Sequence, residues 1–434
     1  MAKYAKALAA FLNASHSNFH AVENLRTALE EQGYARLTQE MEWKLQPGGK
    51  YYTTRNGSAI LAFRVPEGEP RGFLMSASHS DRPTFQIKEN AEQPSGAYLR
   101  LAVEKYGGMI LSTWLDRPLS VAGRVLVRTG SGIESRLVDL DRDLCLIPNV
   151  AIHMNRKVNE GYAWNPAVDL LPLVGPAAKK GWFLDTVAEA AGAAPQDILG
   201  TDLTLYVRQP ASLWGPEEDY ISSQALDDLQ CAFGTMQGFL AAGTGASVPL
   251  CCVFDNEEVG SNTMQGADSD FLKDALQRIC AALDLDLSRE LGRSLMVSAD
   301  NAHAVHPNHP EYADPGNGPV VNGGIVLKFN ANRRYTTDGV TAALFREVCA
   351  RAEVPVQTYY NRADLPGGST LGNISTAQVS VPTVDIGLAQ LAMHSAYETA
   401  GTRDTDHLVE AMAVYFGLNL RREGDLIRLE SCEK

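Results

Sequence analysis

The sequence lacks any apolar run of the roughly 20 residues that are needed to cross a bilayer. Its opening, MAKYAKALAAFLNAS, predicts an amphipathic helix and lacks the long apolar centre of a signal peptide. Positive charge is also scarce, because 38 Lys and Arg stand against 52 Asp and Glu and give a net charge of -14. Nucleic acids and anionic membranes both require a positive face on their partners. We therefore expect no nucleic-acid partner and no membrane partner, and we expect a cytoplasmic protein.

The seven cysteines form no CxxC pair. Most of them stand in apolar surroundings, and Cys251 and Cys252 are adjacent. Cysteines of this kind are typical of buried free thiols in a reducing compartment. The pattern therefore gives little support to a cysteine nucleophile or to a thiolate zinc site.

The remaining composition is that of a globular chain. A length of 434 residues, with 45% hydrophobic and 21% charged residues, is enough for two or three domains with a sizeable core. Continuous apolar runs such as SAILAFRV, GFLMSAS and VPLCCVF alternate with helical patterns such as DDLQCAFGTMQGFLAAG and TDHLVEAMAVYFGL. Strands that alternate with helices predict a layered α/β domain, and fully apolar strands predict a sheet covered on both faces.

Residues 90–215 depart from this alternation. Short turn-forming stretches (KYGG, RTGSG and DLDRD) separate strand-like runs such as RVLVRT and SRLVDL, which predicts hairpins. We interpret 90–215 as a β-rich insertion. It would interrupt an α/β domain that consists of residues 1–89 and 216–434.

Five short motifs, SASHSDRP, QALDDLQ, FDNEEVGS, LMVSADNAHAVHP and LAMHSAYE, supply the carboxylates and imidazoles that could hold metal. Four of the five lie at or just beyond an apolar strand. Strand ends are where ligand sites form in open α/β sheets. Imidazole and carboxylate without thiolate suit zinc, cobalt or manganese. The candidate residues are His79, Asp81, Asp227, Asp228, Glu257, Glu258, Asp300 and His394.

The adjacent glutamates Glu257 and Glu258 need positive charge nearby, because like charges held close raise one another's pKa. Three carboxylates and two neutral histidines bring about three negative charges, whereas two divalent ions bring four positive charges. One positive charge therefore remains to hold a hydroxide, which is the charge state of a hydrolase. Successive residues at a strand end point differently, so one glutamate can bind metal while the other acts as general base. Each motif alone is more often a solvated turn. Their coincidence favours a metal site.

Seven blocks in the chain together resemble the aspartyl aminopeptidase family of metallo-aminopeptidases: SHSD, ALDDL, DNEEVGS, SADNAHAVHPN, LKFNANRRYTTD, LPGGSTLGNI and MHSAYETAGTRD. They occur in this order from about residue 79 to residue 404, so the resemblance covers most of the chain. It implies a layered mixed-sheet metallopeptidase domain of the α/β class with an inserted β-rich domain for dimerisation and oligomerisation. It also implies a homo-oligomer, a tetrahedral dodecamer, with two Zn²⁺ per subunit, or Co²⁺ or Mn²⁺ in their place.

The implied activity is removal of an N-terminal residue, preferably Asp or Glu, from peptides with a free N-terminus. By position in the blocks, His79, Asp227 and Asp300 would hold one metal ion. Asp227, Glu258 and His394 would hold the other ion, with Asp227 bridging the two.

The resemblance also implies roles around the metals. Glu257 would be the general base, and Asp81 would orient His79 as carboxylates behind metal-bound imidazoles do. His153 would reach the site of a neighbouring subunit and stabilise the tetrahedral oxyanion, although an interface or core position is the alternative for this residue.

Lys328 matches a lysine of the family's substrate pocket, where it would meet an acidic side chain; a surface or structural lysine is the alternative. Gly368, Ser369 and Thr370 match the family's substrate-contacting loop.

The chain departs from the family pattern at Asp228, where Asn is usual, and at Tyr397, where Arg is usual. The charge around the metals is therefore altered.

Other functions remain open at this point. An aminopeptidase of neutral or broad specificity fits the same metal ligands. A two-metal carboxypeptidase or deacylase uses a similar site but needs a free carboxylate or an acyl-amine. A binding or scaffold protein is disfavoured because both Glu257 and a complete ligand set are present. His303, His306 and His309 have the wrong regularity for one tetrahedral site, and we favour a loop role for them.

Overall fold

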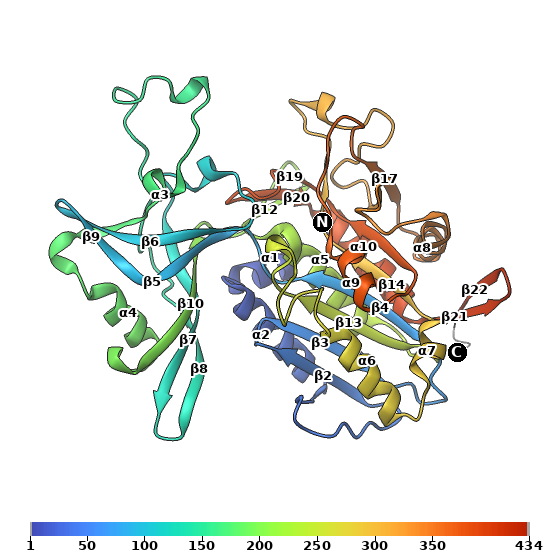
Figure 1. The fold of residues 1–434 in the computed structure, drawn as a ribbon. Helices are drawn as coiled ribbons and strands as arrows, with labels where there is room; N and C mark the ends of the chain where they lie inside the picture. The colour runs from blue at the N-terminus through green and yellow to red at the C-terminus, as the bar shows by residue number, and fades with distance from the viewer. Residues whose placement is uncertain (1, 432–434) are drawn as a thin grey trace.

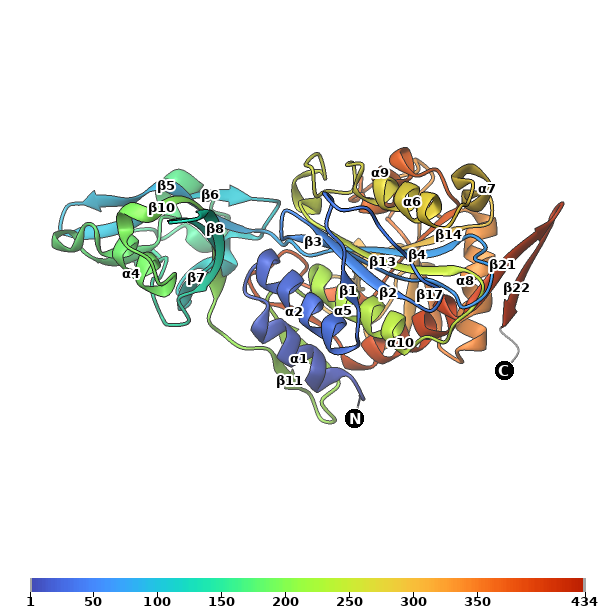
Figure 2. The ribbon, with the colours of Figure 1, turned by 90° about the horizontal axis from the view of Figure 1, so that it is seen from below.

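A computed structural model describes residues 2–431 and shows two units side by side (Figures 1 and 2). The larger unit is built on a nine-stranded mixed sheet, which confirms the predicted α/β class. In sheet order its strands are β1 (Ala35–Arg36), β2 (Lys50–Arg55), β3 (Ala59–Arg64), β13 (Val248–Phe254), β4 (Phe73–His79), β14 (Leu295–Ala299), β18 (Thr383–Gly387), β16 (Ile325–Phe329) and β17 (Val356–Tyr360).

Helices cover both faces of this sheet (Figure 2). This is why β3, β4 and β13 are mostly apolar and are buried along their whole length. One face packs against α2 (Asn18–Glu31), α5 (Leu226–Ala241), α8 (Gly339–Arg351) and α10 (Thr402–Phe416), with α1 (Ala5–Ala14) against α2 and α5. The other face packs against α6 (Phe271–Ala282), α7 (Leu287–Leu291) and α9 (Leu371–Gln378).

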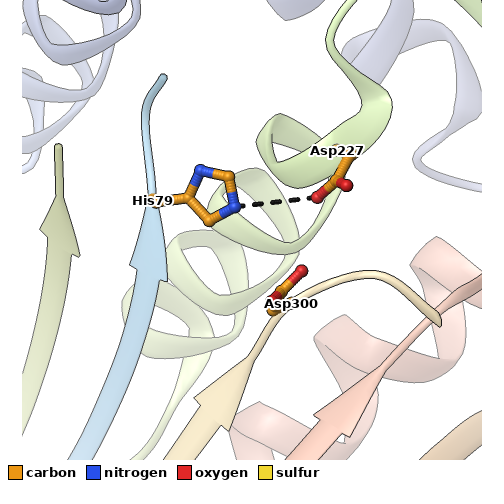
Figure 3. A group of neighbouring side chains, drawn as sticks. All are labelled: His79, Asp227 and Asp300. Carbon is orange, nitrogen blue, oxygen red and sulfur yellow. Dashed lines mark ion pairs between the residues drawn. The ribbon is translucent and has the colours of Figure 1, made fainter. Parts of the chain in front are cut away.

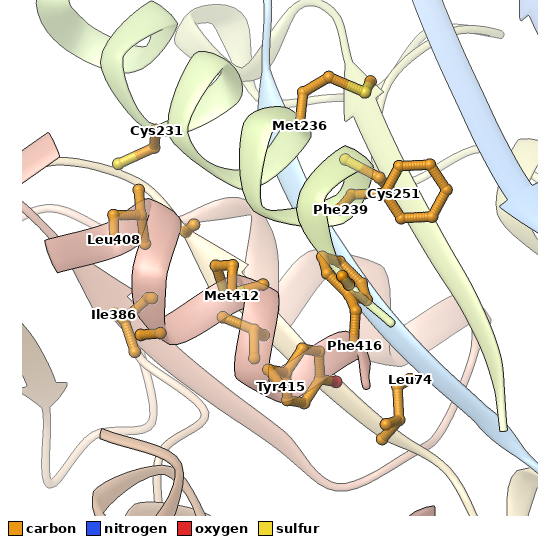
Figure 4. Packing of buried hydrophobic residues seen from close by; sticks show 14 of the residues in the cluster. Leu74, Cys231, Met236, Phe239, Cys251, Ile386, Leu408, Met412, Tyr415 and Phe416 are labelled. Carbon is orange, nitrogen blue, oxygen red and sulfur yellow. The ribbon is translucent and has the colours of Figure 1, made fainter. Parts of the chain in front are cut away.

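The main core lies between α5, α10 and the central strands (Figure 4). Phe239 of α5 meets Phe416 of α10 edge to face, with ring centroids 5.3 Å apart. The hydroxyl of Tyr415 donates to the backbone carbonyls of Met75 on β4 and Leu295 on β14. Because α5 is packed against the sheet in this way, the position of its first turn at one end of the sheet is fixed.

The smaller unit is a six-stranded antiparallel sheet formed by residues 84–207. Its strands, in sheet order, are β8 (Gly132–Asp139), β7 (Leu119–Thr129), β10 (Ile198–Val207), β5 (Thr84–Ser95), β6 (Tyr98–Tyr106) and β9 (Leu173–Pro176). Besides the predicted hairpins, this unit contains two helices that the turn-rich sequence does not predict, α3 (Pro166–Asp169) and α4 (Trp182–Ala190). The apolar side of α4, including Phe183 and Val187, completes the core of this unit.

A third sheet of five short strands borders the larger unit: β11 (Ser212–Trp214), β12 (Tyr220–Ser223), β20 (Glu398–Gly401), β19 (Ala389–Leu391) and β15 (Ala302–His303). The chain ends in a projecting hairpin of β21 (Leu418–Glu423) and β22 (Leu426–Ser431) (Figure 1). Six short 3-10 turns complete the described chain: η1 (Leu111–Trp114), η2 (Val158–Glu160), η3 (Ala177–Lys179), η4 (Pro195–Asp197), η5 (Glu257–Val259) and η6 (Pro310–Tyr312).

The cysteines among the described residues are buried free thiols, as the sequence predicts. Six of them are free and buried, among them Cys251 and Cys252 on β13, while Cys432 lies outside the described residues. Within residues 2–431, no helix combines the length and the apolar character that a membrane crossing demands.

Candidate metal centre

The parallel strands β4, β13 and β14 end at one edge of the large sheet. His79, the last residue of β4, lies opposite Phe254, the last residue of β13. Asp300 directly follows β14, and Glu257 and Glu258 form the short turn η5 just beyond β13. The parallel register therefore brings these side chains to a common point.

Two other elements approach this point from outside the three strands. Asp227 lies in the irregular first turn of α5, and its peptide bond to Asp228 is cis. His394 lies in the loop between β19 and β20 with a positive φ of 65°. Glu398 ties the two together: its carboxylate accepts a hydrogen bond from the backbone N–H of Asp227 at 3.0 Å and another from that of His394 at 2.7 Å.

Asp227 stands between two imidazoles. Its Oδ1 is 3.6 Å from Nε2 of His79 (Figure 3), and its Oδ2 is 3.4 Å from Nε2 of His394. The carboxylate of Asp300 faces the same space from the end of β14 (Figure 3). On the other side, Oε1 of Glu258 is 3.3 Å from Nε2 of His394. Each oxygen of one carboxylate thus faces a different histidine, which is the arrangement of a bridging ligand.

Asp81 lies behind this cluster. Its Oδ1 is 3.3 Å from Nδ1 of His79, so Nε2 of the ring is directed toward Asp227. The same carboxylate accepts hydrogen bonds from the backbone N–H groups of Glu257 and Glu258, both at 3.1 Å. Asp81 therefore positions both an imidazole and the glutamate turn.

The donor set fits divalent metal ions. His79, Asp227 and Asp300 form one group of close ligand atoms, and Asp227, Glu258 and His394 form another. Two ligands about 2.0 to 2.1 Å from a tetrahedral zinc ion are about 3.3 to 3.4 Å apart, close to the distances around His394. Among residues 2–431, the buried oxygens Oδ1 of Asp227 and Oε1 of Glu258 find no hydrogen-bond partner. Such oxygens are costly in a protein interior unless something binds them.

The electrostatics of the cluster also favour a cation. Burial raises the pKa of Glu258 to about 7 and that of Asp300 to about 6, and it raises the pKa of Glu257 well above its usual value. Burial lowers the pKa of His394, but the carboxylates of Asp227 and Glu258 outweigh this effect and raise it to about 11. The carboxylate shifts reflect burial and the His394 shift reflects nearby negative charge; divalent ions at this place would stabilise the ionised carboxylates.

Lys328 lies on β16 and is buried, with 2% of its surface exposed. Its ammonium donates to the backbone carbonyls of Asp300 at 2.6 Å and Asn301 at 3.0 Å, and it is 3.8 Å from Oδ2 of Asp300. It also lies over the ring of Tyr335, 5.3 Å from the centroid. Its hydrogen bonds to other residues in the range 2–431 use two of the three N–H groups of the ammonium.

The loop with Gly368, Ser369 and Thr370 leads into α9. Gly368 borders a pocket of about 420 Å³, together with the aromatic rings of His303, His306, Tyr312, Tyr359 and Tyr360. Thr370 is buried and donates to Asp385, so it anchors the loop. Among the described residues, His303, His306 and His309 belong to no group of metal-ligand geometry.

His153 lies in an exposed loop between residues 148 and 165 that projects from the smaller unit (Figure 1). The structure does not bring it into the cluster within the same chain.

The two departures from the family pattern have definite contacts. Oδ2 of Asp228 accepts the backbone N–H of His79, and the hydroxyl of Tyr397 donates to the carbonyl of Pro210.

Sequence reasoning missed the functions of Glu398 and Tyr106. Glu398, within the block MHSAYETAGTRD, supports the backbones of Asp227 and His394. Tyr106 lies within the KYGG stretch, which was interpreted as turn punctuation, and its hydroxyl donates to Asp81 at 2.6 Å. The Asp81–Tyr106 contact joins two units of the fold, so neither neighbouring sequence nor periodicity signals it.

The model of the family described as aminopeptidase I zinc metalloprotease (M18) matches residues 11–416 of the chain. A protein of Clostridium acetobutylicum named probable M18 family aminopeptidase 2 is 42% identical over 428 residues, which are 96% of this chain and 99% of that protein. A protein of the same name from Pseudomonas aeruginosa is 41% identical over 414 residues, covering 94% of this chain and 96% of that protein.

Solved structures of similar fold include Ape4, in a complex with Nbr1, at a TM-score of 0.92 and 34% identity over 95% of this chain and 85% of that one. Another is mApe1 of S. cerevisiae, solved as a dodecamer, at a TM-score of 0.85 and 28% identity over 95% of this chain and 96% of that one.

Proposed function

The chain belongs to the M18 family of zinc metallo-aminopeptidases, and on that premise we propose that it removes one N-terminal residue, preferably Asp or Glu, from peptides by means of two zinc ions. The observation that carries the proposal is the position of Asp227, whose two carboxylate oxygens face the imidazoles of His79 and His394. His79, Asp227 and Asp300 would hold one ion, and Asp227, Glu258 and His394 the other.

Zinc bound in this way supplies Lewis acidity, which polarises a peptide carbonyl and makes water acidic. Glu257 lies in the same turn as Glu258, and its backbone is fixed by Asp81. Burial raises the pKa of Glu257 well above its usual value, and the carboxylates of Asp300 and Glu258 add to the rise. A carboxylate that holds a proton more strongly is a better general base. Glu257 would accept a proton from the attacking water and pass it to the leaving amine.

His153 would act on the site of a neighbouring subunit, as the oxyanion donor of a homo-oligomer. Support comes from the loop around it, where Val150, Ile152 and Met154 expose 50%, 47% and 85% of their surfaces. Clustered exposed apolar side chains mark interaction surfaces. The related mApe1 was solved as a dodecamer, and we propose a tetrahedral dodecamer for this chain as well, with the six-stranded unit in its contacts.

The acidic preference would come from the free N–H of Lys328, and Gly368, Ser369 and Thr370 would contact the substrate backbone. An aminopeptidase of neutral or broad specificity is the second candidate. It is favoured by the burial of Lys328 and by the two hydrogen bonds that its ammonium already makes to backbone carbonyls.

A panel of peptides that differ only in the N-terminal residue tests these proposals, with zinc, cobalt and manganese each added to metal-free protein. We expect faster cleavage of Asp and Glu peptides and none of N-acetylated ones. Equal rates for Leu and Glu peptides would contradict the acidic preference and would support an aminopeptidase of broad specificity. Cleavage of blocked peptides from the carboxyl end would instead indicate a carboxypeptidase or deacylase.

A further inference from the structure

The segment from Tyr106 to Thr113 links the last residue of β6 in the smaller unit to η1. Its sequence is YGGMILST. Although it belongs to the six-stranded unit, it runs along the metal centre of the larger unit. It contacts both loops that carry the ligands of the second proposed ion, the Glu257–Glu258 turn and the His394 loop.

Tyr106 contacts the first of these loops through Asp81. Its hydroxyl donates to Oδ2 of Asp81 at 2.6 Å and accepts from Nδ2 of Asn256 at 2.8 Å. The same Oδ2 accepts the backbone N–H of Glu258. Asp81 is 4% exposed, so few water molecules can replace the hydroxyl as its partner. The orientation of this carboxylate therefore depends on a residue of the other unit.

The glycines that follow allow a close approach to the ligands. Gly107 has a φ of +75°, and a Cβ atom there would lie 3.2 Å from Cβ of Glu258. A Cβ atom on Gly108 would lie 3.9 Å from Nδ1 of His394. A side chain at Gly107 would therefore press on Glu258, whereas the 3.9 Å at Gly108 is an ordinary contact.

The second half of the segment is hydrogen bonded to the His394 loop. The backbone N–H of Ile110 donates to the carbonyl of His394 at 3.0 Å. The hydroxyl of Thr113 accepts the backbone N–H of Ala396 at 2.9 Å. Both loops that carry ligands of the second ion are therefore held by one strand extension of the smaller unit.

We propose that the Tyr106–Thr113 segment is a positioning element by which the six-stranded unit sets the geometry of the metal centre in the same chain, with Tyr106 and Gly107 as its positioning residues. The inference rests on the two-metal centre proposed above. It gives the smaller unit a second task besides any contact between subunits: a displacement of this unit would loosen Asp81, and through Asp81 both His79 and the glutamate turn.

Tyr106→Phe tests the inference because it removes only the hydroxyl. Tyr98→Phe is its matched control, since Tyr98 lies on the same strand and is 60% exposed. Zinc affinity is measured by competition with a chelator, and kcat and KM are measured on a zinc-loaded sample. Loss of a hydrogen-bond partner directly behind a metal ligand costs about 10- to 100-fold in metal affinity or activity. Tyr106 acts one residue further out, through Asp81, so the lower figure of about 10-fold applies. We expect that loss in Tyr106→Phe, with KM nearly unchanged and with the Tm of the metal-free protein and its oligomeric state preserved.

Gly107→Ala gives an independent test, with Gly96→Ala as its control. Both glycines have a positive φ, +75° and +58°, so both substitutions strain the backbone similarly. Only Gly107 has Glu258 within reach, whereas a Cβ atom on Gly96 meets nothing within 4 Å. We expect weaker zinc binding in Gly107→Ala alone.

Zinc affinity and kcat within twofold of wild type in Tyr106→Phe would overturn the inference, as would equal effects of the two glycine substitutions. These outcomes leave the proposed function standing if the wild-type protein binds zinc and cleaves peptides. A wild-type protein that binds no zinc would refute both the inference and the proposed function. A protein that binds zinc without cleaving peptides would refute the function alone, because the affinity comparison still tests the segment.

Discussion

Replacement of Lys328 by Met tests two roles of its ammonium group. One is structural support of Asp300 and Asn301, and the other is the proposed recognition of an acidic substrate. The ammonium donates to the carbonyls of Asp300 and Asn301, and its remaining N–H is the proposed partner of an acidic substrate side chain. Methionine keeps the length and most of the volume of lysine. It removes the charge and all three donors.

The structural cost can be worked out from these contacts. Each carbonyl that loses its donor costs about 1 to 3 kcal/mol. At the 3.8 Å between Nζ and Oδ2 of Asp300, an effective dielectric constant of about 20 gives an attraction of about 4 kcal/mol. Removing one partner of a buried pair of this kind costs about 3 to 5 kcal/mol of unfolding free energy, because the charge of Asp300 is left buried without compensation. Any resulting displacement of Asp300 would lower the turnover of every substrate alike.

The substrate cost affects acidic peptides alone. An acidic side chain that loses its buried partner loses about 2 to 5 kcal/mol of binding, and the lower figure corresponds to about 30-fold. The ratio of kcat/KM for a Glu peptide to kcat/KM for a Leu peptide cancels the structural damage. We expect this ratio to fall at least about 30-fold in Lys328→Met, and to stay constant in Lys273→Met, which removes an exposed lysine on α6.

A fall of both rates with an unchanged ratio would refute the specificity role. It would leave Lys328 as a support of Asp300. A wild-type enzyme that already prefers Leu would refute the acidic preference directly, and it would leave the aminopeptidase assignment intact.

Four further predictions address the metals, the subunits and the junction between the units. Glu257→Gln should keep its metal and lose about 100- to 10,000-fold in kcat, whereas Glu258→Gln should lose metal; equal metal contents would contradict this division. His153→Phe should lose about 100- to 1000-fold in kcat while assembling normally, and mixed oligomers with Glu257→Gln should regain activity if the site is shared. Removal of metal by a chelator should lower the Tm, since an ion at 100 times its Kd contributes about 2.7 kcal/mol, and zinc should restore it. Burial raises the pKa of Asp139, but the hydrogen bonds with His16 and Tyr206 outweigh it and keep the pKa below its usual value of 3.8; the His16–Asp139 contact between the units should therefore be complete above about pH 5 and be lost only as the pH falls below about 4, so that hydrogen exchange of β8, corrected for the intrinsic rate, should speed up over this fall in the wild type and not in Asp139→Asn.

The classes of structure in this chain could be predicted because they depend on local patterns. The apolar strands β3, β4 and β13 appear as continuous runs in the sequence since helices bury both of their faces. The helix α2 follows from the spacing of Val22, Leu25 and Leu29. The two helices of the smaller unit were missed, because α3 has four residues and α4 has nine, too few for a clear period among turn signals.

The ligand candidates could also be found in the sequence, since each stands beside an apolar strand or in a motif shared with the family. What the sequence could not provide was their joint geometry. The carboxylate of Asp227 faces two histidines that lie 148 residues before it and 167 residues after it, at positions 79 and 394. Only the packing of the end of β4, the first turn of α5 and the loop between β19 and β20 against one another brings these atoms within 4 Å.

The sequence by itself therefore determined the α/β class, the irregular middle region and the residue types that can hold metal, because periodicity and composition act over a few residues. The tertiary structure alone decided that Tyr106 supports Asp81, that Glu398 holds two ligand backbones, and that Lys328 is buried against Asp300. The physical reason is that a hydrogen bond requires its two atoms to come within about 3 Å. For residues far apart in the chain, that distance is set by how sheets and helices pack, and no local pattern encodes it.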